Sequence, residues 1–274
     1  MTARARRSRA RPTRAVPNTL TGNISIHDGV AGLALGRPRE LIVYLPPGYE
    51  EADRRYPVLY VQDGQNVFNA ATAFGGQEWR LDEAAEVLIR AGEIPPLIIV
   101  GIPNAGFHRV DEYTPTCDAR RHAGGQADAY GHLLLDEVKP YVDRTFRTEP
   151  GREGVAVLGS SMGALVSLYL ALSRAHAIGT ALVMSPSVWW DRRVILGQAR
   201  TFRSDRRPRV WLDVGTLEGR SALRDVRALR TALISSGWED GVDLIYTEYD
   251  GAEHTEAHWG ARVGHALRWL FPRA

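Results

Sequence analysis

One serine in this sequence stands between two glycines at the spacing used by serine nucleophiles. The motif Gly-Ser-Ser-Met-Gly at 159–163 follows an apolar run at 155–158 and leads into an apolar helical pattern over 163–172. A strand that turns directly into a helix strains the serine between them and exposes its hydroxyl, and the flanking glycines leave room for the tight turn. Ser160 competes, but only Ser161 has a glycine two residues away on each side. The pattern therefore predicts Ser161 as a nucleophile for acyl transfer.

A serine nucleophile needs a base, and histidine is a common one. In this strand–serine–helix arrangement the chain order is nucleophile, acid and then histidine. Among the eight histidines, only His254, His258 and His265 come late enough. His254 follows the last predicted strand and precedes a helical pattern, so we expect it on a loop at the same sheet edge as the serine. We predict His254 as the base and keep His258, one helical turn further on, as the alternative.

His254 and His258 also have the i, i+4 spacing of metal ligands on a helix. In zinc peptidases a glutamate directly follows the first histidine, whereas Glu256 lies two residues on, about 200° around the helix. The sequence also supplies no third protein ligand for such a site. We therefore expect no metal site, and acyl transfer by a serine requires no cofactor.

Two carboxylates could orient the histidine. Asp213 falls inside a predicted strand, and Glu218 comes just after Gly215 on the loop at the carboxyl end of that strand. Active sites of open parallel sheets lie at this end. Glu218 is therefore the favoured acid, with Asp213 as the alternative.

The negative oxygen that forms during acyl transfer needs two backbone N–H donors. One should be the N–H of Met162, directly after the nucleophile. The other should come from the loop that follows the predicted strand at 58–61, where Gly64 allows the chain to fold closely. We predict the N–H of Gln65 for this role.

These residues must be held by strands that alternate with helices. Short β-branched and aromatic runs predict strands near 41–45, 58–61, 97–100, 155–158, 181–184, 210–212 and 242–246, with a weaker one near 21–26. Apolar residues spaced by three and four predict helices over 130–141, 163–172, 223–233 and 259–270, and further helices are expected near 83–91 and 189–200. This alternation indicates an α/β fold with one mostly parallel sheet covered by helices on both faces.

The composition places the chemistry in a single body with a basic tail. The chain has 274 residues and a net charge of +2, and six arginines precede residue 15. The remaining 28 basic and 32 acidic residues leave the body at −4. We expect a disordered tail over 1–18 and one domain over 19–274. No apolar run is long enough to span a membrane, the single Cys117 cannot form an internal disulfide, and no signal peptide is visible, so a cytoplasmic location is expected.

The assembled motifs resemble the esterase D family of α/β-hydrolases, which includes siderophore (enterochelin) esterases, S-formylglutathione hydrolases and xylan-side-chain esterases. The resemblance extends from about residue 39 to 271. The segments that carry it are 44–49, 60–66, 111–115, 159–163, 185–190, 215–218 and 254–259, and the likeness is greatest to the siderophore-esterase branch. It implies an α/β-hydrolase fold with Ser161 as nucleophile, His254 as base and Glu218 at the acid position. Many relatives have aspartate at that position, which leaves Asp213 open.

These observations together predict a serine carboxylic-ester hydrolase that acts on a small-molecule ester. The substrate could be an aryl ester, an acylated sugar or a siderophore ester. Candidate pocket residues are Trp79, Trp189 and Trp190 as aromatic walls, His108 for an anionic substrate, and His258, which stands where relatives have a small residue.

Two other functions remain open. The first is acyl transfer to an alcohol acceptor instead of water. The second is an inactive hydrolase-like scaffold that binds nucleic acid through its arginine tail. The sequence disfavours this function, because a nucleophile, an acid and a base are present in the required order. The sequence does not indicate an oligomeric state.

Overall fold

The computed structural model describes residues 18–30 and 32–271, and its central feature is one large mixed sheet. Within these residues eight strands pair in the order β1-β2-β4-β3-β7-β8-β9-β10. The strands β4, β3, β7, β8, β9 and β10 are parallel to one another, whereas β2 pairs antiparallel with both β1 and β4. The strands are β1 (Asn23–Val30), β2 (Arg39–Leu45), β3 (Val58–Gln62), β4 (Ile98–Ile102), β7 (Val155–Ser160), β8 (Thr180–Met184), β9 (Arg209–Gly215) and β10 (Leu244–Tyr249).

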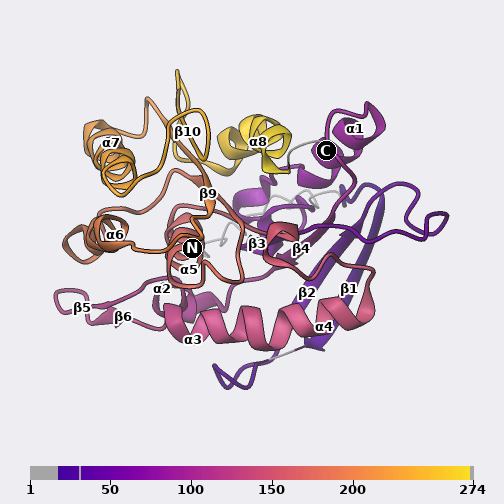
Figure 1. Cartoon of the computed structure of the whole chain (residues 1–274). Helices are drawn as coiled ribbons and strands as arrows, with labels where there is room; N and C mark the ends of the chain where they lie inside the picture. The colour runs from indigo at the N-terminus through magenta and orange to yellow at the C-terminus, as the bar shows by residue number, and fades with distance from the viewer. Residues whose placement is uncertain (1–17, 31, 272–274) are drawn as a thin grey trace, which may run out of the picture.

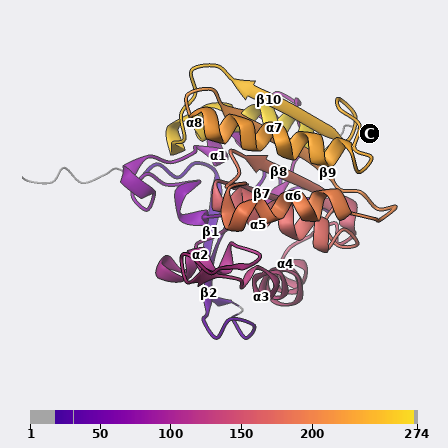
Figure 2. The ribbon, with the colours of Figure 1, turned by 90° about the vertical axis from the view of Figure 1, so that its left-hand side faces the viewer.

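Helices cover both faces of this sheet (Figure 1). On one face lie α1 (Leu81–Arg90) and α8 (Glu256–Leu270). On the other lie α3 (Ala127–His132), α4 (Lys139–Thr145), α5 (Met162–Ser173), α6 (Trp190–Thr201) and α7 (Arg220–Ile234). Figure 2 shows α5, α6 and α7 side by side. The predicted α/β fold with a mostly parallel sheet and helices on both faces is confirmed.

The side chains of each central strand alternate between the two cores. In β3, Val58 and Tyr60 pack under α3 to α7, whereas Leu59 and Val61 pack under α1 and α8. Because all of these residues are apolar, the strand reads as a continuous hydrophobic run, as expected for a strand that is buried on both faces. The same burial surrounds α5, whose residues are apolar on nearly every side.

Several smaller elements complete the fold. A π-helical segment, η4 (Leu133–Val138), joins α3 to α4, so the helical pattern predicted over 130–141 is one continuous helical run. Short 3-10 helices are η1 (Gly64–Asn66), η2 (Phe74–Gly76), η3 (Gly106–His108) and η5 (Arg152–Gly154), beside a short α2 (Arg109–Glu112). The pair β5 (Cys117–Asp118) and β6 (Ala123–Gly124) forms a separate two-stranded sheet.

One predicted strand is displaced. The run at 242–246 becomes β10 only from Leu244 onward, because the N–H groups of Val242 and Asp243 bond to the carbonyl of Glu239 and close a turn there. The predicted tail over 1–18 lies outside the described residues except for its last position, so its extent and the start of the domain at 19 stay predictions.

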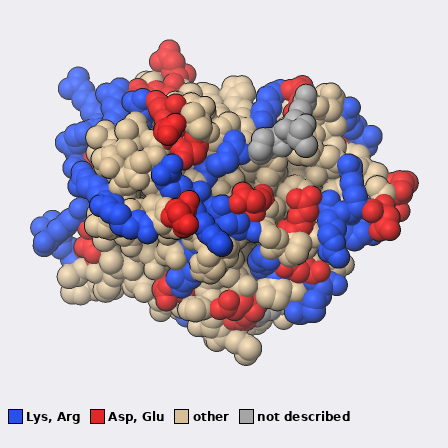
Figure 3. Space-filling view, viewed as in Figure 1, with Lys and Arg blue, Asp and Glu red and all other residues tan. Residues whose placement is uncertain are grey.

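The surface of the described residues carries both signs of charge. In Figure 3, acidic and basic side chains are interspersed over one face, and basic ones gather on the side where α6 and α7 lie. No helix in the described part of the chain combines the length and apolar character needed to cross a membrane.

Candidate active site

Ser161 occupies the sharp turn between β7 and α5. Its backbone has φ 55° and ψ −119°, a conformation that costs energy for any residue with a side chain. Gly159 makes this turn possible, because a Cβ atom there would stand 2.3 Å from the carbonyl carbon of Gly163. The turn therefore sets the serine hydroxyl at the carboxyl end of the sheet, with the N-terminus of α5 directly after it.

A continuous hydrogen-bonded chain connects Ser161 to a histidine and a carboxylate. The Nε2 of His254 lies 3.0 Å from the Oγ of Ser161, and its Nδ1 lies 2.7 Å from Oε2 of Glu218. The indole of Trp259 stands edge-on to the imidazole, with the ring centroids 4.8 Å apart. The three groups come from the β7–α5 turn, the loop after β9 and the loop before α8, and only the fold brings them together.

Hydrogen bonds to Glu218 favour its ionised form beside the imidazole. Its side chain is 1% exposed, and its Oε1 accepts hydrogen bonds from the hydroxyl of Ser185 at 2.6 Å and from the N–H of Gly215 at 2.7 Å. Burial alone would raise its pKa, but these bonds and the one with His254 outweigh burial and hold the pKa of Glu218 below its ordinary value.

Asp213, the alternative acid, has different partners. Its Oδ1 lies 2.9 Å from Nη2 of Arg262, and its Oδ2 accepts a hydrogen bond from Nε1 of Trp211 at 3.0 Å. Burial raises the pKa of Asp213, and the guanidinium of Arg262 opposes that rise. The contact with His254 is thus made by Glu218, whereas Asp213 neutralises a buried arginine.

The alternative base, His258, is also accounted for by other contacts. Its Nδ1 accepts a hydrogen bond from the N–H of Glu253 at 3.1 Å and lies 3.1 Å from the hydroxyl of Thr255, which caps α8. The histidine that contacts Ser161 is therefore His254.

The predicted oxyanion donors lie at the starts of two helices, where backbone N–H groups have no acceptor within the helix. Met162 is the first residue of α5 and Gln65 the second residue of η1, positions whose N–H groups have no intrahelical partner. The η1 turn is fixed in place, because Oε1 of Gln65 accepts a hydrogen bond from the N–H of Asn104 at 3.1 Å. Gly64 was expected to bring its loop close to the serine. The structure shows that its close neighbour is the backbone of Gly101 in β4, which a Cβ at position 64 would approach to 2.4 Å.

Ser161 and His254 open into a cavity of 810 Å³. Opposite them the wall is polar: Asp63 forms two hydrogen bonds of 2.7 Å with Arg109, and its Oδ1 accepts another from Asn104 at 2.6 Å. Asp63 adopts a left-handed backbone conformation, with φ 56°, at the end of β3. The carboxylate fixes Arg109 at the cavity wall and neutralises its charge.

Glu256 adds a titratable carboxyl to this cavity. Its Oε1 accepts a hydrogen bond from Nδ2 of Asn66 at 3.0 Å, and its Oε2 accepts one from Nε1 of Trp79. Burial raises the pKa of Glu256 to about 7, with a further rise from the nearby charge of Asp63. The cavity therefore holds a carboxyl that changes charge near neutral pH.

The predicted pocket residues are largely elsewhere. Trp79 and Trp190 are each 1% exposed, because the indole of Trp79 packs against Trp259 and Nε1 of Trp190 donates to the carbonyl of Thr116. Both are therefore core residues, and the prediction that they wall a pocket is corrected.

Two more predicted pocket residues are also displaced from the catalytic cavity. Trp189 is 43% exposed, lies under the guanidinium of Arg121 and borders a separate hollow. His108 is exposed on η3 and is absent from the cavity wall. Of the five predicted pocket residues, His258 lines the cavity.

The sequence reasoning missed residues that share this site. Ser187 places its Oγ 3.2 Å from the Oγ of Ser161, and Ser185 joins Glu218 to Arg262. The segment at 185–190 contributed to the family resemblance, which was the available signal for these two serines. Asp63 and Glu256 also lie in segments that carried the resemblance, 60–66 and 254–259, but their contacts with Arg109, Asn66 and Trp79 join residues distant in the sequence and gave no signal.

Comparisons with known proteins agree with this architecture. A family model described as "Putative esterase" matches residues 32–270. The chain is 24% identical over 249 residues to the uncharacterized protein YbbA of Bacillus subtilis, covering 85% of this chain and 92% of that protein. It is 27% identical over 224 residues to the ferri-bacillibactin esterase BesA of the same organism, covering 73% of each chain.

Two solved structures share the fold. The BES protein from Bacillus cereus superposes with a TM-score of 0.73 and 20% identity, over 99% of this chain and 100% of that one. The enterobactin esterase FES from Shigella flexneri gives a TM-score of 0.73 and 19% identity, over 92% of this chain and 60% of that one. These likenesses confirm the predicted α/β-hydrolase fold, and with the family match they show that the chain belongs to the putative esterase family and is a carboxylic ester hydrolase.

Proposed function

We propose that the protein hydrolyses esters through an acyl-enzyme on Ser161. The observation that carries the proposal is the hydrogen-bonded chain from Ser161 through His254 to Glu218. His254 takes the hydroxyl proton as Ser161 Oγ attacks the ester carbonyl, and the ionised Glu218 stabilises the imidazolium that results. Glu218 suits this role because its pKa is held below the ordinary value.

The remaining steps use the same groups. The N–H groups of Met162 and Gln65 donate to the negative oxygen of the tetrahedral intermediate. His254 then gives its proton to the leaving alkoxide, which departs as the alcohol and leaves an ester on Ser161. Water, activated by His254, attacks this ester, and collapse of the second intermediate releases the acid and restores the serine hydroxyl.

The test replaces the nucleophile and compares it with another serine of α5. Ser161→Ala should lower the hydrolysis of p-nitrophenyl acetate by a factor of about 10³ or more and keep the same thermal unfolding. Ser173→Ala, at the exposed end of the same helix, should keep full activity. A fluorophosphonate probe should label the wild type on the peptide that contains Ser161. Unchanged turnover in Ser161→Ala would exclude the mechanism.

For the substrate class, we propose a bulky ester of the siderophore type. Support comes from relatives whose names state such activity: ferri-bacillibactin esterase, siderophore triacetylfusarinine C esterase and siderophore enterobactin esterase. The cavity of 810 Å³ accepts a substrate larger than a simple acetyl ester. Its wall includes the side-chain amides of Gln65 and Gln77 for the polar groups of such a molecule.

A panel of esters tests this class independently of the mechanism. We expect kcat/KM for a catecholate trilactone, with and without iron, to exceed that for p-nitrophenyl acetate and for feruloyl and acetyl sugar esters. Equal or greater turnover of the sugar esters would overturn the substrate class and leave the acyl-enzyme mechanism standing. Product analysis with added alcohols measures whether water is the preferred acceptor.

A further inference from the structure

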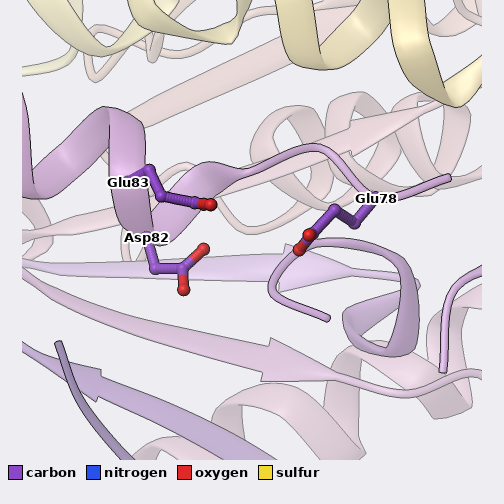
Figure 4. A group of neighbouring side chains, drawn as sticks. All are labelled: Glu78, Asp82 and Glu83. Carbon is purple, nitrogen blue, oxygen red and sulfur yellow. The ribbon is translucent and has the colours of Figure 1, made fainter. Parts of the chain in front are cut away.

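Three carboxylates converge beside the first turn of α1, outside the catalytic cavity. Glu78 precedes the helix, whereas Asp82 and Glu83 belong to its first turn. Figure 4 shows the three side chains turned toward a common space. One oxygen from each lies within 4.8 Å of the others. The helix dipole stabilises carboxylates in the first turn of a helix. That interaction does not explain why three carboxylates face one another here.

An independent observation is that each of these groups has a buried oxygen with no hydrogen-bond partner among the residues that the structure describes. These atoms are Oε2 of Glu78, Oδ1 of Asp82 and Oε2 of Glu83. Asp82 is 0% exposed, and the N–H of Thr21 donates to its other oxygen at 2.7 Å. A buried carboxylate oxygen without a donor is costly and rare in folded proteins. Three converging carboxylates, each with such an atom, indicate a missing positive partner.

Within residues 18–30 and 32–271, the neighbouring hydrogen-bond donors do not supply that partner. Nε of Arg80 lies 3.1 Å from Oε1 of Glu83, but the Arg80 side chain is 71% exposed and its contact is not with the unpartnered Oε2. Thr19 donates its hydroxyl to Glu78 through Oε1, again away from the unpartnered oxygen. Both contacts leave the three oxygens named above without a donor in the described part of the chain.

We propose that Glu78, Asp82 and Glu83 form a site for a divalent cation of the calcium class. All of the donors are oxygens, the ligands that calcium and magnesium prefer. Two oxygens bound to one calcium ion at about 2.4 Å are at most about 4.8 Å apart, and one oxygen from each of the three carboxylates meets that limit. Magnesium requires a stricter octahedral geometry and retains most of its water, so a buried all-carboxylate cluster favours calcium.

The position of the site suggests what the ion would hold together. Thr19 and Thr21 place the described start of the chain against Glu78 and Asp82. On the other side of Glu78, Gln77 lines the catalytic cavity. A bound cation would therefore fasten the N-terminal segment and α1 to the segment that walls the active site.

The rival explanation is that protons relieve the repulsion. Burial raises the pKa of Asp82 to about 8, and the adjacent carboxyl of Glu83 adds to this rise. A carboxyl pair that shares a proton would show no specific response to a metal ion. The two explanations separate when the protein is studied at about pH 8.5, above the raised pKa of Asp82.

The test uses the full chain, stripped with a chelator and titrated with calcium chloride by calorimetry. We expect saturable binding of one ion below about 1 mM and a rise in Tm with calcium concentration. Asp82→Asn keeps the shape of the side chain and should weaken calcium binding about tenfold or more. Glu93→Gln, a half-exposed carboxylate just beyond the far end of α1, should bind calcium like the wild type.

Several outcomes would overturn the proposal. No saturable heat up to about 10 mM calcium, or equal binding by wild type and Asp82→Asn, would show that protons satisfy the cluster. Tighter binding of magnesium than of calcium would overturn the assigned ion class. If circular dichroism shows that Asp82→Asn does not fold, Glu83→Gln replaces it in the same comparison. None of these readouts depends on ester hydrolysis.

Discussion

Asp213 and Arg262 form a buried ion pair, with Oδ1 of the aspartate 2.9 Å from Nη2 of the arginine and side chains 0% and 3% exposed. The same Nη2 atom donates to the hydroxyl of Ser185, and that hydroxyl donates to Glu218. The two carboxylates of this region therefore have separate tasks. Asp213 is the nearer partner of the arginine, whereas Glu218, whose Oε1 lies 3.5 Å from the same Nη2 atom, contacts His254 through Oε2.

This separation predicts a stability defect at Asp213. Asp213→Asn would remove the nearer of the two carboxylates paired with Arg262, because Oε1 of Glu218 lies 3.5 Å from the same Nη2 atom. Breaking a buried ion pair typically costs about 3–5 kcal/mol in the free energy of unfolding, and the remaining carboxylate should hold the loss to the lower part of that range. Activity per folded molecule should fall by less than about tenfold, because the contact between Glu218 and His254 remains. Urea unfolding and active-site titration measure the two effects. A fully stable variant with a large loss of kcat would instead identify Asp213 as the acid.

The matching prediction concerns Glu218. Glu218→Gln removes the charge that stabilises the imidazolium and allows the wrong tautomer of His254, so kcat should fall by about 10²–10⁴. The fold should survive, because Gln can still accept the bond from Gly215 at the same position. Steady-state kinetics beside Asp213→Asn provide the comparison. A smaller loss of kcat in Glu218→Gln than in Asp213→Asn would reverse the assignment.

The sheet and the nucleophile turn could be predicted because their signals are local. The apolar run at 155–158 and the glycine spacing around Ser161 lie within nine residues of chain, and burial on both faces of the sheet makes strands such as β3 read as apolar runs. The contact of His254 with Glu218 followed from chain order and from the sheet edge at which parallel strands end.

The cavity wall could not be predicted in the same way. Glu256 meets Trp79 across 177 residues of sequence, and Ser185 meets Arg262 across 77. No periodicity connects residues so far apart. Tryptophan occurs both in protein cores and in pocket walls. The residue type therefore did not show that Trp79 and Trp190 are buried in the core.

The tight turn predicts a sharp contrast between two glycines. Gly159→Ala would place Cβ 2.3 Å from the backbone of Gly163, where no flexible side chain can yield. We expect a loss of about 2–4 kcal/mol in the free energy of unfolding, together with lost activity as Ser161 shifts. Gly197→Ala, in α6 with no atom within 4 Å of the added Cβ, should instead stabilise by about 0.5–1 kcal/mol. Equal unfolding of both variants would contradict the packing argument.

The carboxyl of Glu256 predicts how stability changes with pH. Its pKa in the folded protein is about 7, above the ordinary value of 4.5, chiefly because burial disfavours the charged form. A carboxyl with a raised pKa binds its proton more tightly when folded. Its contribution to stability is therefore complete below about pH 4.5 and is lost as the pH rises through about 7.

Replacing Glu256 with glutamine should remove this pH dependence. The amide of glutamine has one acceptor oxygen and cannot accept hydrogen bonds from both Asn66 and Trp79. Glu256→Gln should therefore lower the free energy of unfolding by a small amount that does not depend on pH. As the pH rises from about 5.5 to about 8.5, the wild type acquires a partly buried charge and the variant does not. The free energy of unfolding of the variant should therefore rise by about 1–2 kcal/mol relative to that of the wild type over this range. Thermal and urea unfolding across this range measure the difference. Glu40→Gln, an exposed carboxylate on β2, should show no such gain. A difference between Glu256→Gln and wild type that stays constant with pH would show that Glu256 is already ionised throughout the range.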